Sequence, residues 1–313
     1  QCDTEENLLR SFIEYWMDDV PDVITGWNIQ LYDIPYIAKR LDRVLGEKLM
    51  KRMSPWGLVS EGEVHIMGRK HTTFDLGGVT QLDYLDLYKK FTYKAQESYR
   101  LDYIASVELG QKKLDHSEFD TFKEFYSKGW QKFIEYNIID VELVDRLEDK
   151  MKLIELALTM AYDAKVNYND VFYQVRMWDT IIYNYLKKRN IVIPPKNRST
   201  KNEKYAGAYV KEPIPGKYDW VVNFDLNSLY PHLIMQYNIS PETLVEEKHP
   251  TATVDKILNQ DIDINNQYST CANGAQYRKD VRGFLPELMD KMYGDRVIFK
   301  EKMIEAKKQY EKT

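Results

Sequence analysis

A carboxylate at the end of an apolar run is the clearest chemical feature of this chain. Asp225 follows the run Trp220–Phe224, which predicts a short buried β-strand, and it opens the heptapeptide Asp225–Pro231. Asp supplies the hard oxygen ligands that Mg²⁺ prefers, and Mg²⁺ usually shares its coordination shell with substrate phosphates. Taken alone, an Asp at a strand end is more often a helix cap or a turn residue.

A second pair of carboxylates lies in the N-terminal half. Asp33 falls between a predicted strand at 23–27 and a predicted helix at about 34–45, whereas Tyr136 and Asp140 are four apart and share one face of a helix. Read singly, Asp33 is a helix N-cap and the other two are an ordinary exposed pair. Read together, they fit two-metal hydrolysis of a phosphodiester, which needs carboxylates from separate elements around metals about 3.5–4 Å apart. A Tyr hydroxyl beside them could orient the attacking water.

Apolar spacing predicts the elements that must position these side chains. Helical periodicity is present at 5–16, at about 34–45, within 97–150, within 152–190 and from about residue 285 onward. The sequence predicts strands at 23–27 and 81–87, a hairpin within the Gly-rich residues 46–80, and a second sheet region over 205–282. The polar loop 196–204 is the best candidate for a domain boundary.

Size and composition set broad limits. A chain of 313 residues with 43% hydrophobic residues is long enough for two or three domains with real cores. A net charge of −5 does not indicate a nucleic-acid binder, but a basic groove can be local and a metal site is itself acidic. Two Cys are too few for a disulfide framework or a cysteine metal site. No apolar run approaches the roughly 18 residues that span a membrane, so no membrane partner is expected.

Several ordered motifs resemble those of one enzyme family. The heptapeptide Asp225–Pro231 resembles motif A of the family B DNA polymerases, and the stretch Asn238–Thr243 is similar to the replicative polymerases of large tailed, myovirus-type bacteriophages. Asn28 to Asp33 and Tyr136 to Asp140 resemble the second and third proofreading exonuclease motifs of that family. The resemblance implies a fragment of a template-directed DNA polymerase with a 3′–5′ exonuclease, working by two-metal phosphoryl transfer.

The fold that the resemblance implies is multidomain, with mixed α/β and α+β architecture. Residues 1–152 are expected to form a ribonuclease H-like 3′–5′ exonuclease domain that lacks its N-terminal part. Residues 153–196 would be a helical connecting segment, 197–282 a partial palm domain, and 283–313 the start of a fingers helix. The charged helical pattern at the end of the chain has no stop signal, which indicates a piece of a longer protein.

The resemblance also assigns roles at the exonuclease site. It implies that Asp33 and Asp140 are catalytic metal ligands, that Tyr136 orients the water or the scissile phosphate, and that Asn28 positions the DNA. The family's first motif, Asp-x-Glu, does not occur in a strand context in residues 1–32. Two of the four expected carboxylates are therefore absent, and the fragment by itself is expected to be inactive.

At the polymerase site, the resemblance implies that Asp225 and the carbonyl of Leu226 bind the metals. Ser228, Leu229 and Tyr230 are expected to contact the triphosphate and the sugar.

Two further pairs of residues are assigned by the same resemblance. Arg296 and Lys300, four apart on the last helix, are expected to hold the β- and γ-phosphates. Tyr205 and Gly207 belong to a Tyr-x-Gly-like motif expected to contact DNA. The family's later Asp-Thr-Asp carboxylates do not occur before the last residue, Thr313.

The implied cofactor is Mg²⁺ or Mn²⁺, two per active site. The implied partners are primer–template DNA, deoxynucleoside triphosphates and, through a region outside this chain, a sliding clamp. The implied location is the cytoplasm of an infected bacterial host. Two alternatives stay open: a free-standing ribonuclease H-like metal-dependent nuclease, and a non-catalytic DNA-binding subunit of a split polymerase.

Overall fold

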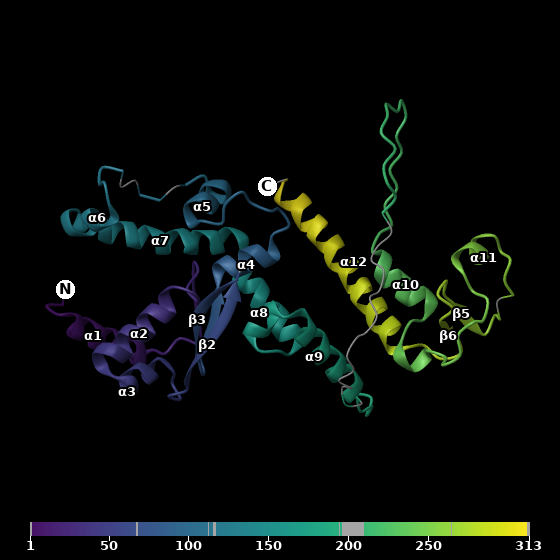
Figure 1. The fold of residues 1–313 in the computed structure, drawn as a ribbon, viewed down its shortest axis with the longest axis horizontal. Helices are drawn as coiled ribbons and strands as arrows, with labels where there is room; N and C mark the ends of the chain where they lie inside the picture. The colour runs from purple at the N-terminus through teal and green to yellow at the C-terminus, as the bar shows by residue number, and fades with distance from the viewer. Residues whose placement is uncertain are drawn as a thin grey trace. The chain divides into compact units, whose positions relative to one another are not determined.

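The computed structural model divides the chain into two units, residues 1–201 and residues 202–313, and each is considered by itself (Figure 1). The structure describes residues 2–66, 68–111, 113–114, 117–193, 195, 210–263 and 265–311. The mixture of helices and strands that the sequence predicts is confirmed. Within the described residues, no helix is long and apolar enough to cross a membrane.

The first part of unit 1 combines three α-helices and a short 3-10 helix with two pairs of strands. Its elements are α1 Glu5–Asp18, β1 Val23–Gly26, α2 Asp33–Leu45, α3 Glu47–Met50, η1 Lys51–Met53, β2 Val59–Ile66, β3 Arg69–Leu76 and β4 Thr80–Asp83. Strands β1 and β4 pair in parallel, with Val23 opposite Thr80, and β2 and β3 form the predicted antiparallel hairpin. Helices α1 and α2 agree with the predicted helices at 5–16 and 34–45.

The second part of unit 1 is helical, as the sequence predicts. Its elements are α4 Tyr84–Phe91, α5 Leu101–Leu109, α6 Phe122–Lys128, α7 Trp130–Met151, α8 Leu153–Ala164, η2 Tyr168–Phe172 and α9 Gln174–Lys187. Helices α5 and α6 lie alongside the long helix α7 (Figure 1). The break between α7 and α8 falls at Lys152, whose φ of 54° is left-handed. Glu148 covers the start of α8 by accepting the N–H groups of Ile154 and Glu155.

Helical spacing explains the two cores of this unit. On α2, Ile34, Ala38 and Leu41 are spaced by four and three residues, so they share one face, and all three are buried. They pack in one cluster with Ile13 and Leu76. Burying a side chain such as Leu41 completely contributes about 1.5–3 kcal/mol.

The other cluster joins the strands to the helices that follow. On α7, Leu143, Val144 and Leu147 are buried against residues of α4, α5 and α8. Leu82, at the end of β4, is completely buried in the same cluster. The cluster therefore holds the C-terminal half of α7 against the β1–β4 pair.

Asp83 is the joint between the parallel strands and the helices. Its side chain is only 3% exposed, and it accepts backbone N–H groups from Asn28 (2.9 Å), Gln30 (3.1 Å) and Leu85 (3.0 Å). Burial raises the pKa of Asp83, and the N–H groups of Gln30 and Asn28 oppose that rise. The bond to Leu85 caps α4, so the predicted strand at 81–87 is wrong beyond Asp83. The apolar residues that follow have helical rather than alternating spacing.

Unit 2 contains fewer regular elements. They are α10 Leu229–Tyr237, η3 Pro241–Thr243, α11 Val254–Leu258, β5 Tyr268–Thr270, β6 Gln276–Arg278 and α12 Phe284–Tyr310. The last helix begins one residue before the predicted position. Strands β5 and β6 are antiparallel, with Tyr268 opposite Arg278. Among the described residues of this unit, the predicted second sheet region is limited to this pair and the bridge between Leu244 and Tyr277.

Buried polar contacts around Asn238 join α10 to α12. Asn238 has a left-handed φ of 56°, which Asn tolerates, and its amide donates to the carbonyls of Arg278 and Val281 at 2.6 and 2.8 Å. Its side-chain oxygen accepts the N–H of Gly283 at 2.9 Å. A Cβ on Gly283 would lie 2.5 Å from the Cβ of Ser240, so only Gly fits there. The stretch Asn238–Thr243 therefore sets the direction in which α12 leaves.

The predicted buried strand before Asp225 is wrong. Residues 220–224 form no strand, and the side chains of Trp220 and Phe224 are 93% and 88% exposed. A strand needs a neighbour to pair its backbone N–H and C=O groups. None of the described residues pairs with this segment, so β-propensity alone does not make it a strand.

Replacing Asp83 by Asn should lower the free energy of unfolding by about 1–3 kcal/mol. The amide keeps one acceptor oxygen but turns an NH₂ group toward a backbone N–H that the carboxylate now accepts. Urea denaturation followed by circular dichroism measures the loss. Asp75→Asn, at an exposed position on β3, is the matched control. Equal stability of the two variants would show that the bonds of Asp83 to the turn after β1 and to α4 do not stabilise the fold.

Candidate active site

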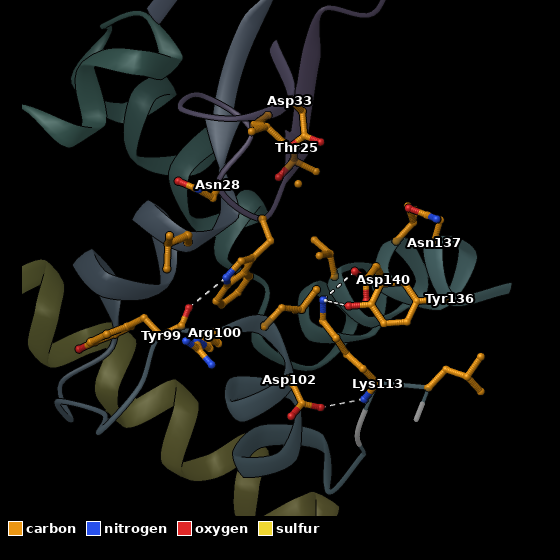
Figure 2. Close-up of a pocket in the computed structure, with 18 residues that line it drawn as sticks. Thr25, Asn28, Asp33, Tyr99, Arg100, Asp102, Lys113, Tyr136, Asn137 and Asp140 are labelled. Atoms are coloured by element: carbon orange, nitrogen blue, oxygen red, sulfur yellow. Dashed lines mark hydrogen bonds and ion pairs between the residues drawn. The ribbon is translucent and has the colours of Figure 1, made fainter. Parts of the chain in front are cut away.

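A cleft of about 1180 Å³ in unit 1 collects the residues predicted for the exonuclease site. Asn28, Asp33, Tyr136 and Asp140 all line it, although more than a hundred residues separate the first two from the last two. Figure 2 shows Asp33 beside the end of β1, with Tyr136 and Asp140 facing it from α7. The structure therefore brings both carboxylates to one cavity from opposite walls.

Asp33 stands at the start of α2, where the helix dipole favours a negative charge. Tyr32 is the N-cap and makes no side-chain cap bond, so the simple prediction that Asp33 is an N-cap is wrong. The Asp33 side chain reaches solvent at the rim of the cleft. Partial burial raises the pKa of its carboxyl, and its own backbone N–H opposes that rise.

Asn28 lies in the turn that Asp83 holds. Its φ of 66° is left-handed, and its N–H donates to Asp83. A Cβ on Gly26 would lie 2.5 Å from the Cγ2 of Ile29, so the small residue lets the turn fold back on itself. The turn therefore presents Asn28 at the cleft through backbone contacts.

The opposite wall contains an ion pair that the sequence did not predict. The Nζ of Lys113 lies 2.6 Å from Oδ2 of Asp140 and donates to the hydroxyl of Tyr136 at 3.2 Å. The N–H of Lys113 also donates to Asp102 at the start of α5, at 2.9 Å. Desolvation lowers the pKa of Lys113, but its bonds to Asp140 and Tyr136 outweigh that effect and the net pKa is raised. A Lys in an irregular polar segment has no periodic signal by which sequence reasoning could find it.

Asp140 keeps one oxygen available for a further partner. Its Oδ1 is buried and has no hydrogen-bond partner among the described residues, although buried carboxylate oxygens normally have one. The carboxylates of Asp33 and Asp140 are hard ligands suited to Mg²⁺ or Mn²⁺. Within the part of the chain that the structure describes, no three His, Cys, Asp or Glu residues form a complete metal site. A cation held by these two carboxylates would fill its shell with water and substrate oxygens.

The residues predicted for the polymerase site lie in unit 2, at the start of α10. Asp225, Leu226, Leu229 and Tyr230 are exposed, and Tyr230 is 72% exposed. Ser228 is the N-cap residue of α10, with a left-handed φ of 51°. The first N–H groups of a helix have no partner within the helix, so this turn presents donors suited to phosphate.

Helix α12 supplies the predicted basic pair of this unit. Arg296 and Lys300 are both exposed and lie one turn apart. Tyr293 connects the same helix to α10, because its hydroxyl accepts from Asn227 at 3.3 Å and its ring meets that of His232 at 4.7 Å. The basic pair and the α10 turn thus belong to one packed helix pair.

The remaining predicted DNA contacts, Tyr205 and Gly207, lie outside the described residues. Taken together, the described side chains are those that metal-dependent phosphoryl-transfer enzymes use: paired carboxylates, a Tyr hydroxyl, a helix N-terminus and a basic pair.

Comparison with known proteins shows to which family of metal-dependent phosphoryl-transfer enzymes the chain is similar. The profile of the exonuclease domain of DNA polymerase family B matches residues 1–104, and the profile of DNA polymerase family B matches residues 173–313. The chain belongs to DNA polymerase family B, and the resemblance seen in its motifs is confirmed.

Individual polymerases are similar in sequence to almost the whole length of this chain. The DNA-directed DNA polymerase of Escherichia phage RB69 is 39% identical over 306 residues, which cover 98% of this chain and 34% of the relative. That of Enterobacteria phage T4 is 36% identical over 301 residues, which cover 96% and 33%. The DNA polymerase delta catalytic subunit of Schizosaccharomyces pombe is 28% identical over 298 residues, covering 91% and 27%. The chain spans about a third of the length of the two phage relatives.

Lys113→Met should lower the free energy of unfolding by about 1–2 kcal/mol at pH 7, because it leaves the half-buried Asp140 without its cation. The raised pKa of Lys113 keeps the pair intact at neutral pH. Its contribution should be lost only as the pH rises above the ordinary Lys value of 10.5 and through the raised one.

Urea denaturation at pH 7 and pH 11 measures this effect, with Lys39→Met as the control. Lys39 makes an exposed ion pair with Glu61 at 3.9 Å, so its loss should cost little. An undiminished cost of Lys113→Met in an Asp140→Asn background would contradict the pairing.

Proposed function

We propose that this chain is part of a template-directed DNA polymerase that also excises 3′ ends, with the excision site in the cleft of unit 1. The observation that carries the proposal is the meeting of Asp33, Tyr136 and Asp140 in one cavity of a chain that belongs to DNA polymerase family B. Polymerisation is proposed for a separate site that begins at Asp225.

The proposed domains follow from the same reading. Residues 1–152 form most of a ribonuclease H-like exonuclease domain and 153–196 a helical connection. Residues 197–282 form part of the palm, and 283–313 begin the fingers. The parallel β1–β4 pair followed by helices supports the first assignment, and the long helix α12 supports the last.

In excision, Asp33 and Asp140 would hold the divalent cations, Mg²⁺ or Mn²⁺, two per site. When bound, such ions supply Lewis acidity and neutralise charge on the phosphate. The hydroxyl of Tyr136 orients the attacking water or the scissile phosphate. Lys113 holds that hydroxyl in place by donating a hydrogen bond to it. Asn28 holds the strand from the opposite wall. The half-buried ion pair with Lys113 holds the Asp140 side chain in place.

In synthesis, Asp225 and the carbonyl of Leu226 would hold the cations, which would supply positive charge to the triphosphate. The N–H groups at the start of α10, at Ser228, Leu229 and Tyr230, face phosphate and sugar oxygens. A further contact comes from α12, whose Arg296 and Lys300 neutralise the β- and γ-phosphates.

The proposed partners are primer–template DNA and deoxynucleoside triphosphates. A sliding clamp would bind a part of the polymerase outside this chain, and the whole would act in the infected bacterial cell.

Two substitutions in the complete polymerase should separate the activities. Asp140→Asn should lower the single-turnover rate of 3′ excision by about 100-fold or more, because a metal ligand is lost, and leave primer extension unchanged. Asp225→Asn should lower primer extension and leave 3′ excision unchanged. A quenched-flow assay of one labelled primer measures excision without deoxynucleotides and extension with them.

Asp145→Asn on α7 and Asp219→Asn before Asp225 are exposed controls, and both should behave as wild type. Loss of both activities in either active-site variant would contradict two separate sites. Excision at the wild-type rate by Asp140→Asn would show that the cleft is not the excision site.

Tyr230→Ala in the complete polymerase should raise ribonucleotide incorporation by about 10- to 100-fold relative to deoxynucleotides, the range expected when a pocket stops rejecting one hydroxyl. The ring is proposed to pack beneath the deoxyribose. It is 72% exposed, so its loss should cost little stability. Single-nucleotide kinetics measure the change, with Tyr310→Ala as a control at another highly exposed Tyr (85%). Unaltered sugar discrimination would refute this role.

A further inference from the structure

A dense cluster of aromatic rings surrounds the junction of α6 and α7, next to the cleft. Its members form a continuous series of ring contacts with centroid separations of 5.1 to 6.4 Å, and they are Phe119, Phe122, Phe125, Tyr126, Trp130, Phe133 and Tyr136. Tyr136 is the member that also lines the cleft. Neither the motifs nor the proposed catalytic roles explain why so many rings gather here.

Phe125 is the centre of this cluster. It is completely buried, and its ring lies 5.1 Å from that of Phe119, 5.4 Å from that of Phe133 and 5.7 Å from that of Tyr136. Phe125 and Tyr136 meet at 89°, the edge-to-face geometry that aromatic quadrupoles favour. Phe122 makes a second T-shaped contact with Tyr136 at 6.4 Å and 75°.

The junction is built so that these rings fit closely. Thr121 caps α6 by accepting the N–H of Glu124 at 3.1 Å. At Gly129, between the two helices, a Cβ would lie 2.5 Å from the Cζ of Phe119. The absence of a side chain at Gly129 therefore leaves room for the ring of Phe119, which packs against Phe125.

Tyr136 is thus held at two ends. Its ring packs against Phe125 and Phe122, and its hydroxyl accepts from the Nζ of Lys113 at 3.2 Å. The same Nζ lies 5.1 Å from the centre of the Tyr136 ring and 2.6 Å from Asp140. The hydroxyl is the atom of Tyr136 farthest from the backbone, so a small rotation about the Cα–Cβ bond displaces it most. A misplacement of about 1 Å can cost about 100-fold in rate.

We propose that Phe125 is a positioning residue for the excision reaction. With Phe122 it fixes the ring of Tyr136, so that the hydroxyl stays between Lys113 and the reacting phosphate. This inference rests on the proposed exonuclease function of the cleft. Phe125 touches neither DNA nor metal and acts through Tyr136.

The test is a double-mutant cycle in the complete polymerase. Single-turnover excision of a single-stranded primer with saturating Mg²⁺ is measured for wild type, Phe125→Leu, Tyr136→Phe and the double variant, together with the affinity for DNA. Phe125→Leu should lower the excision rate by about 10-fold and change DNA affinity by less than about 2-fold. In the Tyr136→Phe background, the same substitution should change the rate by less than about 2-fold.

An equal loss of rate in both backgrounds would overturn the proposal, because Phe125 would then act independently of the hydroxyl. An unchanged rate in Phe125→Leu would also overturn it. The proposed function has its own readout. Wild-type excision by Asp140→Asn would show that the cleft is not the excision site. A loss of excision in Asp140→Asn, with no coupling between Phe125 and Tyr136, would reject the positioning role alone.

Two further variants keep the test independent of folding. Phe122→Leu changes a ring that is 54% exposed, so it spares the core, and its loss of rate should vanish likewise in the Tyr136→Phe background. Phe12→Leu is the control, because the ring of Phe12 contacts that of Trp16 in a tilted geometry and packs against the other core of the unit. It should excise at the wild-type rate. Equal slowing by Phe12→Leu and Phe125→Leu would overturn the proposal.

Discussion

The buried carboxylate of Asp83 is the interaction on which the cleft of unit 1 depends. Burying a carboxylate is unfavourable unless its oxygens are bonded, and here three backbone N–H groups satisfy them. Two come from the turn at Asn28 and Gln30 and one from the start of α4, so one side chain joins the end of β1 to the end of β4. Because α2 follows this turn, the same bonds fix where Asp33 begins its helix.

The opposite wall is held in a different way. The C-terminal half of α7 is anchored by buried Leu143 and Leu147, but Tyr136 and Asp140, in its N-terminal half, are not part of that core. Side-chain contacts must therefore place these two residues: the ion pair with Lys113 and the rings packed against Tyr136. One wall of the cleft is fixed by backbone hydrogen bonds, whereas the other depends on side chains from α6 and from the irregular segment that contains Lys113.

This difference explains how much of the site the sequence could predict. Helices α1 and α2 have strong 3.6-residue periodicity, and the residues at Asp33, Tyr136 and Asp140 stand in recognisable motifs, so local patterns and family resemblance were enough to select them. Lys113 and Phe125 have no such pattern, since their roles arise from contacts across tens of residues or from packing. The strand predicted at 81–87 ended early because the capping bond of Asp83 outweighed the β-propensity of the residues that follow.

The same distinction applies to unit 2. The junction of α10 and α12 is complete within this chain, because the amide of Asn238 and the carboxylate of Glu242 satisfy backbone groups at the start of α12. Arg296 and Lys300 are therefore carried by a helix whose origin is fixed. The segment before Asp225 has no strand to pair with among the described residues, and its apolar side chains are exposed. Helical parts of the proposed nucleotide site form from contacts close in sequence, whereas a strand needs a partner for its backbone groups, and none of the described residues pairs with residues 220–224.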